Sequence, residues 1–503
     1  MFMQRAFISK IFVILLLILS SFLPAQGAQT SASSYGEKIL TTEQIKTDIE
    51  LLKKTYKRLH PGYTRYNDLA TLERSWDEIT TTAEQDNGMS ITDFYLRIQS
   101  SLTLIRCDHT KANLPKAMAK ERNENPIYLP FKWRWIEQRA FVIGVDAENK
   151  LSLLDEVVAI DGRDIKELVQ EVEHYIPVDG YTEWSRNPGI SDSMEFMGGA
   201  VDHFGTLKWK NKARVTVSIK TSYGDIEEIN MPRINYKEYR ALPNLGSDAR
   251  NFKDAVIFER IGDKAAYLRI DTFVNYRETV DPEDIYKPIF KAIKQEKRDV
   301  LILDLRNNGG GSSDASMGLF ANLIAEKMQV KTDMRVNTLE FEDIRPHLWT
   351  WDKRALDPNR IGFSKNDDGG YSLRSWFTDD LDTIKPTKYA FSGKLIALTS
   401  NSNSSGSTNL LSALQSAGRV TMVGEKTGGS KEGVTAGLLF TLTLPESKIT
   451  TRVPFFRYTN NVKSFELGMG VTPDIYAPMT VEAFLRSGDP ALETAKQLIE
   501  ISK

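Results

Sequence analysis

Two segments of this chain, each a short apolar run that stops abruptly in a polar turn, constrain its fold more than any other feature. Residues 300–311 read Val-Leu-Ile-Leu-Asp-Leu-Arg-Asn-Asn-Gly-Gly-Gly, and residues 394–406 read Lys-Leu-Ile-Ala-Leu-Thr-Ser-Asn-Ser-Asn-Ser-Ser-Gly. Such apolar runs predict buried strands, and the Gly, Ser and Asn that follow predict turns. One turn offers backbone N–H groups and the other offers hydroxyls, which are the groups that acyl transfer needs for an oxyanion and for a nucleophile.

The second half of the chain alternates predicted strands and helices, which is typical of an α/β domain. The strands are predicted at 265–270, 300–303, 395–398 and 420–423, and the helices at 285–293 and 410–414. A polar and aromatic insertion with three tryptophans, at about 341–388, is longer than an ordinary connection. A lid or substrate groove and a structural excursion packed on the surface are equal alternatives for it.

Residues from about 41 to 110 carry the apolar spacing of helices. Apolar side chains recur at steps of three and four between residues 45 and 59, and the pattern ends at His-Pro-Gly, residues 60–62, because proline and glycine stop a helix. The same spacing over 94–105 leads into Arg-Cys-Asp-His-Thr. His109 is therefore expected at, or just past, the end of a helix.

The pattern changes to short strands between about 127 and 232. These strands lead to an Asp161-Gly162 turn and a predicted helix at 165–172. The run resembles a PDZ domain, with Leu-Asp-Glu at 154–156 where that family usually has a glycine. The resemblance implies a module that binds an extended peptide end by adding a strand to its sheet.

Composition narrows the class of protein. A chain of 503 residues is long enough for roughly three domains. Its 41% hydrophobic and 26% charged residues are those of a globular protein, not of a disordered or fibrous one. A net charge of −2 argues against a nucleic-acid partner.

The amino terminus has the layout of a secretory signal peptide, predicted at 1–27. Arg5 and Lys10 precede an apolar run over 11–19, and small residues follow at 25–28. A retained anchor is the alternative, but the run is short for a hydrocarbon core about 30 Å thick. We therefore expect export to the periplasm or the medium, with no membrane span after signal removal.

The chain has one cysteine, Cys107, so it forms no internal disulfide and no Cys–Cys metal site. Its five histidines are scattered, and neither a metal nor another cofactor is expected. Cys107 is predicted to be a small buried side chain and not a thiol nucleophile.

The segment 400–407 contains five serines, and Ser404 and Ser405 fall on its predicted strand-to-helix turn. A serine hydroxyl becomes a nucleophile when a base takes its proton, and the N–H of Gly406 is suitably placed to bind an oxyanion. A serine-rich helix cap remains the alternative on these residues alone.

Several motifs occur in an order that resembles the C-terminal processing peptidase family, which includes tail-specific, tricorn-core and retinoid-binding-protein-like branches. The motifs are Asp304-Leu-Arg-Asn-Asn-Gly-Gly-Gly311, Leu398-Thr-Ser followed after five residues by Gly406-Ser407, Gly424-Glu-Lys-Thr-Gly-Gly429 and Gly470-Val-Thr-Pro-Asp474. Two upstream motifs, at 59–66 and 105–110, are similar to the helical region of the branch with a histidine base. The match covers nearly all of the chain after the signal.

The resemblance implies a serine peptidase with a crotonase-like α/β core and a set of site residues. Ser405 matches the nucleophile, with Ser404 as a neighbour that a one-residue slip would promote. Gly406 and an N–H of the Gly309-Gly310 turn match the oxyanion hole, where losing one donor costs about 2.7–4 kcal/mol.

The family uses two kinds of base. In the tail-specific branch a lysine stands where this chain has Ser430, with Lys431 one place later. In the tricorn-like branch a histidine stands in Gly-His-Thr, which Asp108-His109-Thr110 matches except for the aspartate. We therefore predict His109 as the base, because imidazole titrates near neutral pH without help.

The tricorn-like branch adds a serine beside the histidine and a glutamate near the carboxyl end. Asp108 stands at the position of that serine, and Glu466 lies close to that of the glutamate, with one extra residue before Gly470. The alternative role for Asp108 is to orient His109 directly, as a carboxylate does in a catalytic triad.

Together these features predict a multidomain α/β (α+β) chain with five parts. They are a signal peptide at 1–27, a helical domain at 35–122, a PDZ-like domain at 125–235, a catalytic domain at 240–480 and a C-terminal helix at 481–503. The predicted function is an exported serine endopeptidase acting on unstructured polypeptides. An inactive binding protein of the same fold and a small-molecule esterase or amidase are the alternatives; the oligomeric state is not predicted.

Overall fold

The computed structural model describes residues 34–147, 150–191, 193, 195–209, 212–221, 224–244 and 249–500, apart from the side chain of Glu500. The predicted signal peptide lies outside these residues. Among the described helices, none has both the length and the apolar character needed to cross a membrane.

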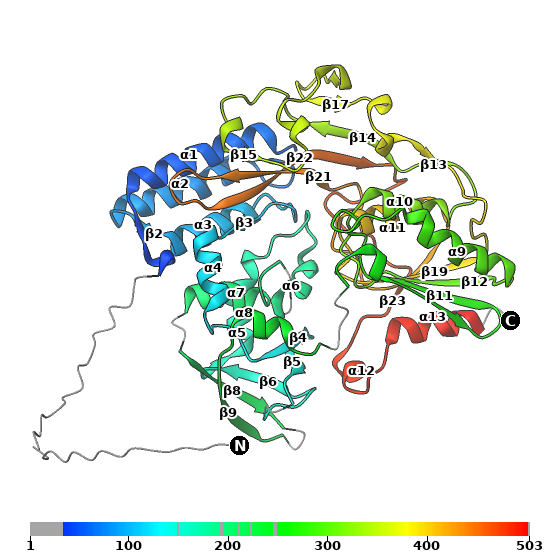
Figure 1. Cartoon of the computed structure of the whole chain (residues 1–503), viewed down its shortest axis with the longest axis horizontal. Coiled ribbons are helices and arrows are strands. Elements are labelled where there is room, and N and C mark those ends of the chain that lie inside the picture. The colour runs from blue at the N-terminus through cyan, green and yellow to red at the C-terminus, as the bar shows by residue number, and fades with distance from the viewer. Residues whose placement is uncertain are drawn as a thin grey trace, which may run out of the picture. The chain divides into compact units, whose positions relative to one another are not determined.

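The amino-terminal part is helical, as predicted. Its helices and two short paired strands are β1 (Ile39–Leu40), α1 (Thr42–Leu59), α2 (Leu69–Gln85), β2 (Met89–Ser90), α3 (Ile91–Thr103) and α4 (Lys116–Glu124). The Thr41 hydroxyl caps α1 by accepting the N–H of Gln44, and α1 ends directly before His60-Pro61. Helix α1 packs against strand β22 of a later sheet (Figure 1).

The middle part is a twisted antiparallel sheet with helices. Its strands are β4 (Phe131–Ile136), β5 (Arg139–Val145), β6 (Glu156–Ile160), β7 (Arg163–Asp164), β8 (Arg214–Lys220) and β9 (Ile226–Pro232). Its helices are α5 (Ile165–Val172), α6 (Asn187–Ser191), α7 (Ala200–Lys208) and α8 (Tyr236–Ala241). Asp161 and Gly162 have φ of +52° and +77°, which confirms the predicted turn between β6 and β7.

The part predicted to be catalytic is built on a six-stranded sheet that is parallel from β11 onward. Its strands, in spatial order, are β10 (Val256–Ile261), β11 (Ala265–Ile270), β12 (Val300–Asp304), β19 (Lys394–Thr399), β20 (Thr421–Gly424) and β23 (Ile475–Tyr476). Leu301 and Leu303 face a core shared with α9 (Pro282–Gln295), α10 (Ser313–Ala321) and α11 (Ser405–Ser416). Val300 and Ile302 face the other side, where α13 (Pro490–Glu500) packs. This α/β layering confirms the predicted fold class.

A second sheet joins parts of the chain that are far apart in sequence. Its strands are β15 (Leu348–Trp349), β21 (Thr435–Thr443), β22 (Thr450–Asn460), β14 (Lys331–Val336), β17 (Tyr371–Leu373), β16 (Phe363–Lys365) and β3 (Ala112–Asn113). Strands β13 (Met328–Gln329) and β18 (Thr383–Ile384) form a separate antiparallel pair. The insertion at 341–388 contributes the short strands β15, β16 and β17 to this sheet (Figure 1).

The carboxyl-terminal segment differs from the single predicted helix over 481–503. It holds two helices, α12 (Val481–Leu485) and α13 (Pro490–Glu500). Ser487 has φ of +56°, and Pro490 starts the second helix, because proline is tolerated in a first turn but not inside a helix.

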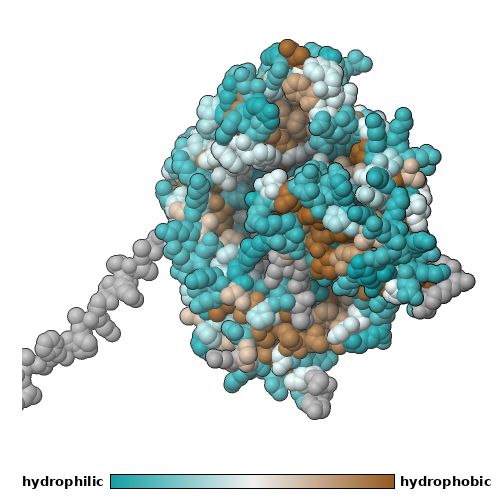
Figure 2. All heavy atoms as spheres, turned by 45° about the vertical axis from the view of Figure 1, so that its right-hand side comes forward, coloured by the Kyte–Doolittle hydropathy of each residue, from teal (hydrophilic) through white to brown (hydrophobic). Residues whose placement is uncertain are grey.

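The face shown in Figure 2 is mainly hydrophilic, with apolar residues gathered in its hollows.

Candidate active site

The two polar turns that the sequence singles out lie side by side. Strands β12 and β19 pair in parallel with Asp304 opposite Leu398, so the turns after both strands emerge at the same edge of the sheet. The Asn403 side chain joins them by donating to the carbonyl oxygens of Leu305 and Asn308 at 2.6 and 3.1 Å. The serine segment and the glycine turn are therefore held as one unit.

Gly310 shows why the turn must be glycine. Its φ is +106°, and a Cβ built there would lie 2.8 Å from both the Gly406 nitrogen and the Ser405 Cβ. Contacts this short do not occur in folded proteins, so only a residue without a side chain lets the turn approach the serine segment.

Ser405 is the first residue of α11 and has φ of +49°, which is unusual for a residue other than glycine. Such strain on a strand-to-helix corner is typical of serine nucleophiles. The Ser404 hydroxyl donates to Asp108 at 2.9 Å, and Ser407 is fully buried. Ser405 is half-buried, and no hydrogen bond of its hydroxyl occurs within the described chain.

The backbone beside Ser405 offers donors for an oxyanion. Gly406 is the second residue of α11, where a helix N–H has no intrahelical partner and the helix dipole favours negative charge. The N–H of Gly310 donates to the Asn308 side chain at 2.9 Å, whereas Gly309 is exposed. Because the Gly310 N–H is engaged within the turn, Gly309 and Gly406 remain the candidate oxyanion donors among the three predicted glycines.

The loop that carries His109 reaches this corner from the helical part of the chain. Strand β3, which follows the loop, pairs with β22 through Ala112 and Asn113. The Asp108 carboxylate accepts the Ser404 hydroxyl at 2.9 Å. The neighbours of His109 and Ser405 are therefore in direct contact, although the two segments lie almost 300 residues apart.

His60, at the end of the upstream helical motif, anchors this loop. It is fully buried, and its Nδ1 accepts the Gly62 N–H at 3.1 Å. Nε2 therefore carries the proton and donates to the Thr110 hydroxyl at 3.0 Å. The second histidine holds the residue next to His109, a role that the sequence did not indicate.

His109 is neutral at neutral pH. Burial lowers its pKa to about 4, in spite of the opposing charge of Asp108 and with a further contribution from Lys111. A neutral imidazole can accept a proton, as a general base must. Its Nδ1 is buried and has no hydrogen-bond partner among the described residues.

Asp108 is fully engaged by groups other than His109. One carboxylate oxygen accepts the Ser404 hydroxyl, and the other lies 3.3 Å from the Lys111 ammonium. Burial acts to raise the pKa of Asp108, but Lys111 and His109 outweigh it and hold the pKa at about 2. Asp108 thus links the base loop to the serine segment as a carboxylate.

Asp179, which no sequence pattern indicated, lies next to His109. Its side chain is 2% exposed. Donor atoms of Cys107, His109 and Asp179 all lie within 4.8 Å of one another. No motif surrounds Asp179, so only the tertiary structure identifies it.

The Cys107 thiol is a buried group, as predicted. It donates to the Thr435 carbonyl oxygen at 3.3 Å, and burial raises its pKa above the ordinary value. The thiol stays protonated, which disfavours both thiolate attack and metal ligation.

Glu466 lies on an exposed turn, and its role stays a prediction. The buried carboxylate near that turn is Glu432, which accepts the Gly468 N–H at 2.8 Å and the Tyr66 hydroxyl at 3.1 Å. It also pairs with Arg65 at 2.9 Å. The upstream helical motif and the turn of Glu466 are thereby tied together.

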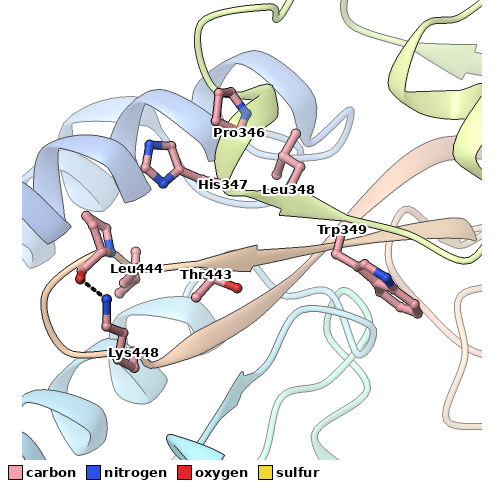
Figure 3. Close-up of a pocket in the computed structure, with 8 residues that line it drawn as sticks. Pro346, His347, Leu348, Trp349, Thr443, Leu444 and Lys448 are labelled. Atoms are coloured by element: carbon pink, nitrogen blue, oxygen red, sulfur yellow. Dashed lines mark hydrogen bonds between the residues drawn. The ribbon is translucent and has the colours of Figure 1, made fainter.

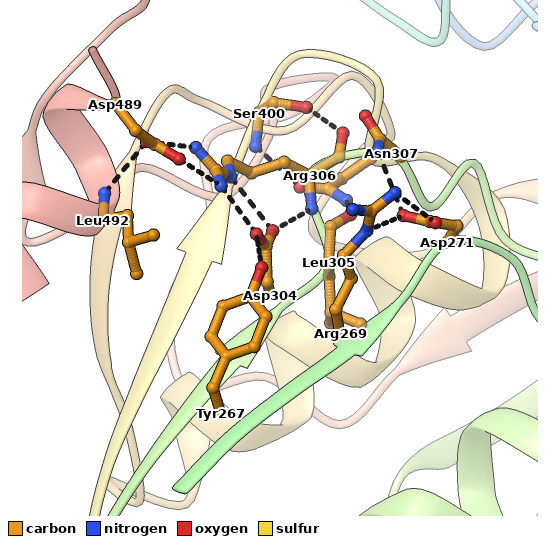
Figure 4. A network of polar contacts seen from close by, with 11 residues as sticks. Tyr267, Arg269, Asp271, Asp304, Leu305, Arg306, Asn307, Ser400, Asp489 and Leu492 are labelled. Atoms are coloured by element: carbon orange, nitrogen blue, oxygen red, sulfur yellow. Dashed lines mark hydrogen bonds and ion pairs between the residues drawn. The ribbon is translucent and has the colours of Figure 1, made fainter. Parts of the chain in front are cut away.

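A charged network holds Arg306 and Asn307, the residues that lead into the glycine turn (Figure 4). The Arg306 guanidinium binds Asp304 in the strand and Asp489 at the start of α13, with contacts of 2.5–3.0 Å. The Ser400 hydroxyl donates to the Arg306 carbonyl oxygen. Asn307 donates to Asp271 at 3.0 Å. Both polar turns are thus fixed to the sheet and to the carboxyl-terminal helix.

A surface pocket of about 320 Å³ lies elsewhere, between β15 and the end of the β21–β22 hairpin (Figure 3). It is lined by Pro346, His347, Leu348, Trp349, Thr443, Leu444, Pro445 and Lys448. None of the predicted catalytic residues lines it.

Comparison with known proteins bears on the fold and on the family. Residues 264–477 match the model of Peptidase family S41, and residues 125–242 match a PDZ domain model. Mature CPAF in complex with lactacystin is 15% identical, with 91% of this chain and 98% of that chain covered and a TM-score of 0.63. Mature CPAF alone is 14% identical, with 88% and 94% covered and a TM-score of 0.60. A search of curated proteins gave no match.

Proposed function

We propose that this chain, in which residues 264–477 match the model of Peptidase family S41, is a serine-type peptidase that cleaves unstructured polypeptides with Ser405 as the nucleophile and His109 as the general base. The observation that carries the proposal is the strained corner at Ser405, against which the Gly310 turn packs and the His109 loop rests.

In the proposed reaction, the Ser405 oxygen attacks the scissile carbonyl carbon while His109 takes the hydroxyl proton. The negative oxygen then accepts N–H donation from Gly406 and Gly309. His109 returns the proton to the leaving nitrogen as the C–N bond breaks, and water releases the acyl group by the reverse sequence. Glu466 is proposed to support this set from its turn.

The PDZ domain, residues 125–242, is proposed to hold an extended end of the substrate, because such domains bind peptides by strand addition. Export to the periplasm or the medium is proposed from the signal-like residues 1–27. Sequencing the amino terminus of the mature protein from fractionated cells tests this part, and an intact Met1 in the cytoplasm contradicts it.

A fluorophosphonate probe with mapping of the modified residue tests the mechanism. We expect labelling at Ser405 in the wild type. Ser405→Ala and His109→Ala are expected to lose both the labelling and the hydrolysis of an unfolded polypeptide. Ser402→Ala, in the same segment, is the matched control and keeps both. Binding of polypeptide without labelling favours an inactive binding protein, and turnover of short esters alone favours a small-molecule hydrolase.

A further inference from the structure

Two neighbouring residues at the proposed base, His109 and Asp179, each have an unpartnered polar atom. His109 Nδ1 and Asp179 Oδ2 are both buried, and neither has a hydrogen-bond partner among the described residues. A ring nitrogen of His109 lies within 4.8 Å of an Asp179 carboxylate oxygen. Buried polar atoms are rarely left unpaired, and catalytic hydrogen bonds are often long in ligand-free enzymes and tighten when substrate binds.

Asp108 and Glu466, the two carboxylates that the sequence suggests for the site, are less suited to pair with His109. Both oxygens of Asp108 are engaged, by Ser404 and by Lys111. Glu466 is exposed to solvent, where a carboxylate has little hold on a buried imidazole. Asp179 has one oxygen without a hydrogen bond in the described chain, while the other accepts the Asp108 N–H at 3.0 Å.

The backbone around Asp179 is fixed to the site on both sides. The Gly180 N–H donates to the Arg106 carbonyl oxygen at 2.9 Å, which ties the segment to the His109 loop. The Thr182 hydroxyl donates to the carbonyl oxygens of Asp179 and Gly428 at 2.8 and 2.7 Å. Asp179 is thus held in place by rigid backbone contacts, as a positioning residue must be.

We propose that Asp179 is the carboxylate that orients His109 and stabilises its charged form during catalysis. This inference rests on the proposed function of His109. When Ser405 Oγ bonds to the carbonyl carbon, its proton moves to His109, and the resulting imidazolium presents its Nδ1–H to Asp179. Asp179 keeps its own charge throughout, and the proton leaves with the amine when the C–N bond breaks.

The surrounding charges give this pair a distinctive pH dependence. Burial, and then the nearby Asp108 carboxylate, raises the pKa of Asp179 to about 7, while Arg65 opposes and Glu432 adds to the rise. The orienting carboxylate is therefore formed on the alkaline side of neutrality. Because Asp179 and His109 interact, activity reports apparent pKa values of the pair.

Asp179→Asn tests the proposal, since asparagine keeps the size and the acceptor for the Asp108 N–H. We expect kcat to fall by about 10²- to 10⁴-fold with little change in KM, as for removal of a triad carboxylate. The alkaline rise in kcat/KM through pH 7 is expected to vanish. Asp202→Asn is the matched control, because Asp202 is also 2% exposed and accepts a backbone N–H, from Leu129.

A second measurement does not depend on turnover. In Ser405→Ala protein, the His109 ring signal is followed by NMR as a function of pH, with and without Asp179→Asn. We expect the added substitution to lower the His109 pKa, because it removes the carboxylate that favours the imidazolium.

The outcomes separate this inference from the proposed function. An inactive, unlabelled wild type with an Asp179-dependent His109 signal contradicts the proposed function and leaves the pairing intact. An active wild type in which Asp179→Asn keeps kcat and the pH profile overturns the pairing. A His109 signal that Asp179→Asn leaves unchanged also overturns the pairing. A larger loss of kcat in Glu466→Gln than in Asp179→Asn overturns it as well.

Discussion

The two halves of the active site are built in different ways. The half with Ser405 and the glycine turn consists of two loops at the ends of adjacent parallel strands, and side chains within those loops hold it together. The half with His109 is one loop fixed by contacts from four distant parts of the chain: β22, His60, Asp179 and Ser404. The first half joins two turns at one edge of a single sheet, whereas the second half depends on contacts from four separate parts of the chain.

The difference extends to hydrogen bonding. In the glycine turn, the side chains of Arg306, Asn307 and Asn308 all have partners. In the base half, His109 Nδ1 and Asp179 Oδ2 have no hydrogen-bond partner among the described residues. A preorganised oxyanion site favours a fixed geometry, whereas the base must exchange a proton and change charge in every cycle.

Breaking the charged network at Arg306 is expected to have the largest effect on stability. Arg306→Met leaves Asp304 and Asp489 without their cation, and removal of one member of such a partly buried pair costs about 3 kcal/mol. Thermal unfolding followed by circular dichroism measures the loss. Arg354→Met is the control, because its pair with Asp352 is exposed, and a similar loss in both variants contradicts the proposed support.

Gly310→Ala should damage the same half through sterics alone. The added Cβ meets the Gly406 nitrogen at 2.8 Å, and the positive φ strains alanine further. Displacing an oxyanion donor lowers kcat by about 10²- to 10³-fold, which corresponds to about 2.7–4 kcal/mol. Steady-state kinetics measure it. Gly369→Ala, at another positive φ but in open space, is the control for strain without a clash.

This contrast also explains what the sequence could predict. The strands β12 and β19 and the polar turns that follow them could be predicted from apolar runs that end in Gly and Ser, which are local patterns. The helices ending at His60 and the turn at Asp161 were predictable for the same reason. The choice of Ser405 and its pairing with the Gly309-Gly310 turn came from the family resemblance. Asp179 and the anchoring role of His60 were not, because a lone buried polar residue carries no periodicity and acquires meaning only through its tertiary neighbours.

Loosening the base half is expected to give a smaller kinetic effect. His60→Gln keeps a polar side chain but removes the imidazole that links Gly62 to Thr110. We expect kcat to fall about tenfold, equivalent to about 1.4 kcal/mol, because the His109 loop is still held by β3 and Asp108. His174→Gln is the control, since that exposed histidine lies in the region that matches the PDZ domain model. Equal kcat in wild type and His60→Gln removes His60 from the positioning of the base.

The smallest expected effect is a change in stability on replacing Asp179. It distinguishes a buried carboxylate that is kept for catalysis from one that supports the fold. The pKa of Asp179 is raised from 3.8 to about 7 in the folded protein, mainly by burial. A raised carboxyl pKa means that the folded state holds the proton more tightly. The contribution of Asp179 to the free energy of unfolding is therefore full below about pH 4 and is lost as pH rises through about 7.

An asparagine side chain cannot ionise, and Asp179→Asn is therefore expected to match the wild type at about pH 4 and to unfold about 2 °C higher at about pH 8. Calorimetry at the two pH values measures the difference. A variant that is less stable at the higher pH makes Asp179 a structural support, whereas greater stability with lower activity is the trade-off expected of a buried charge kept for catalysis.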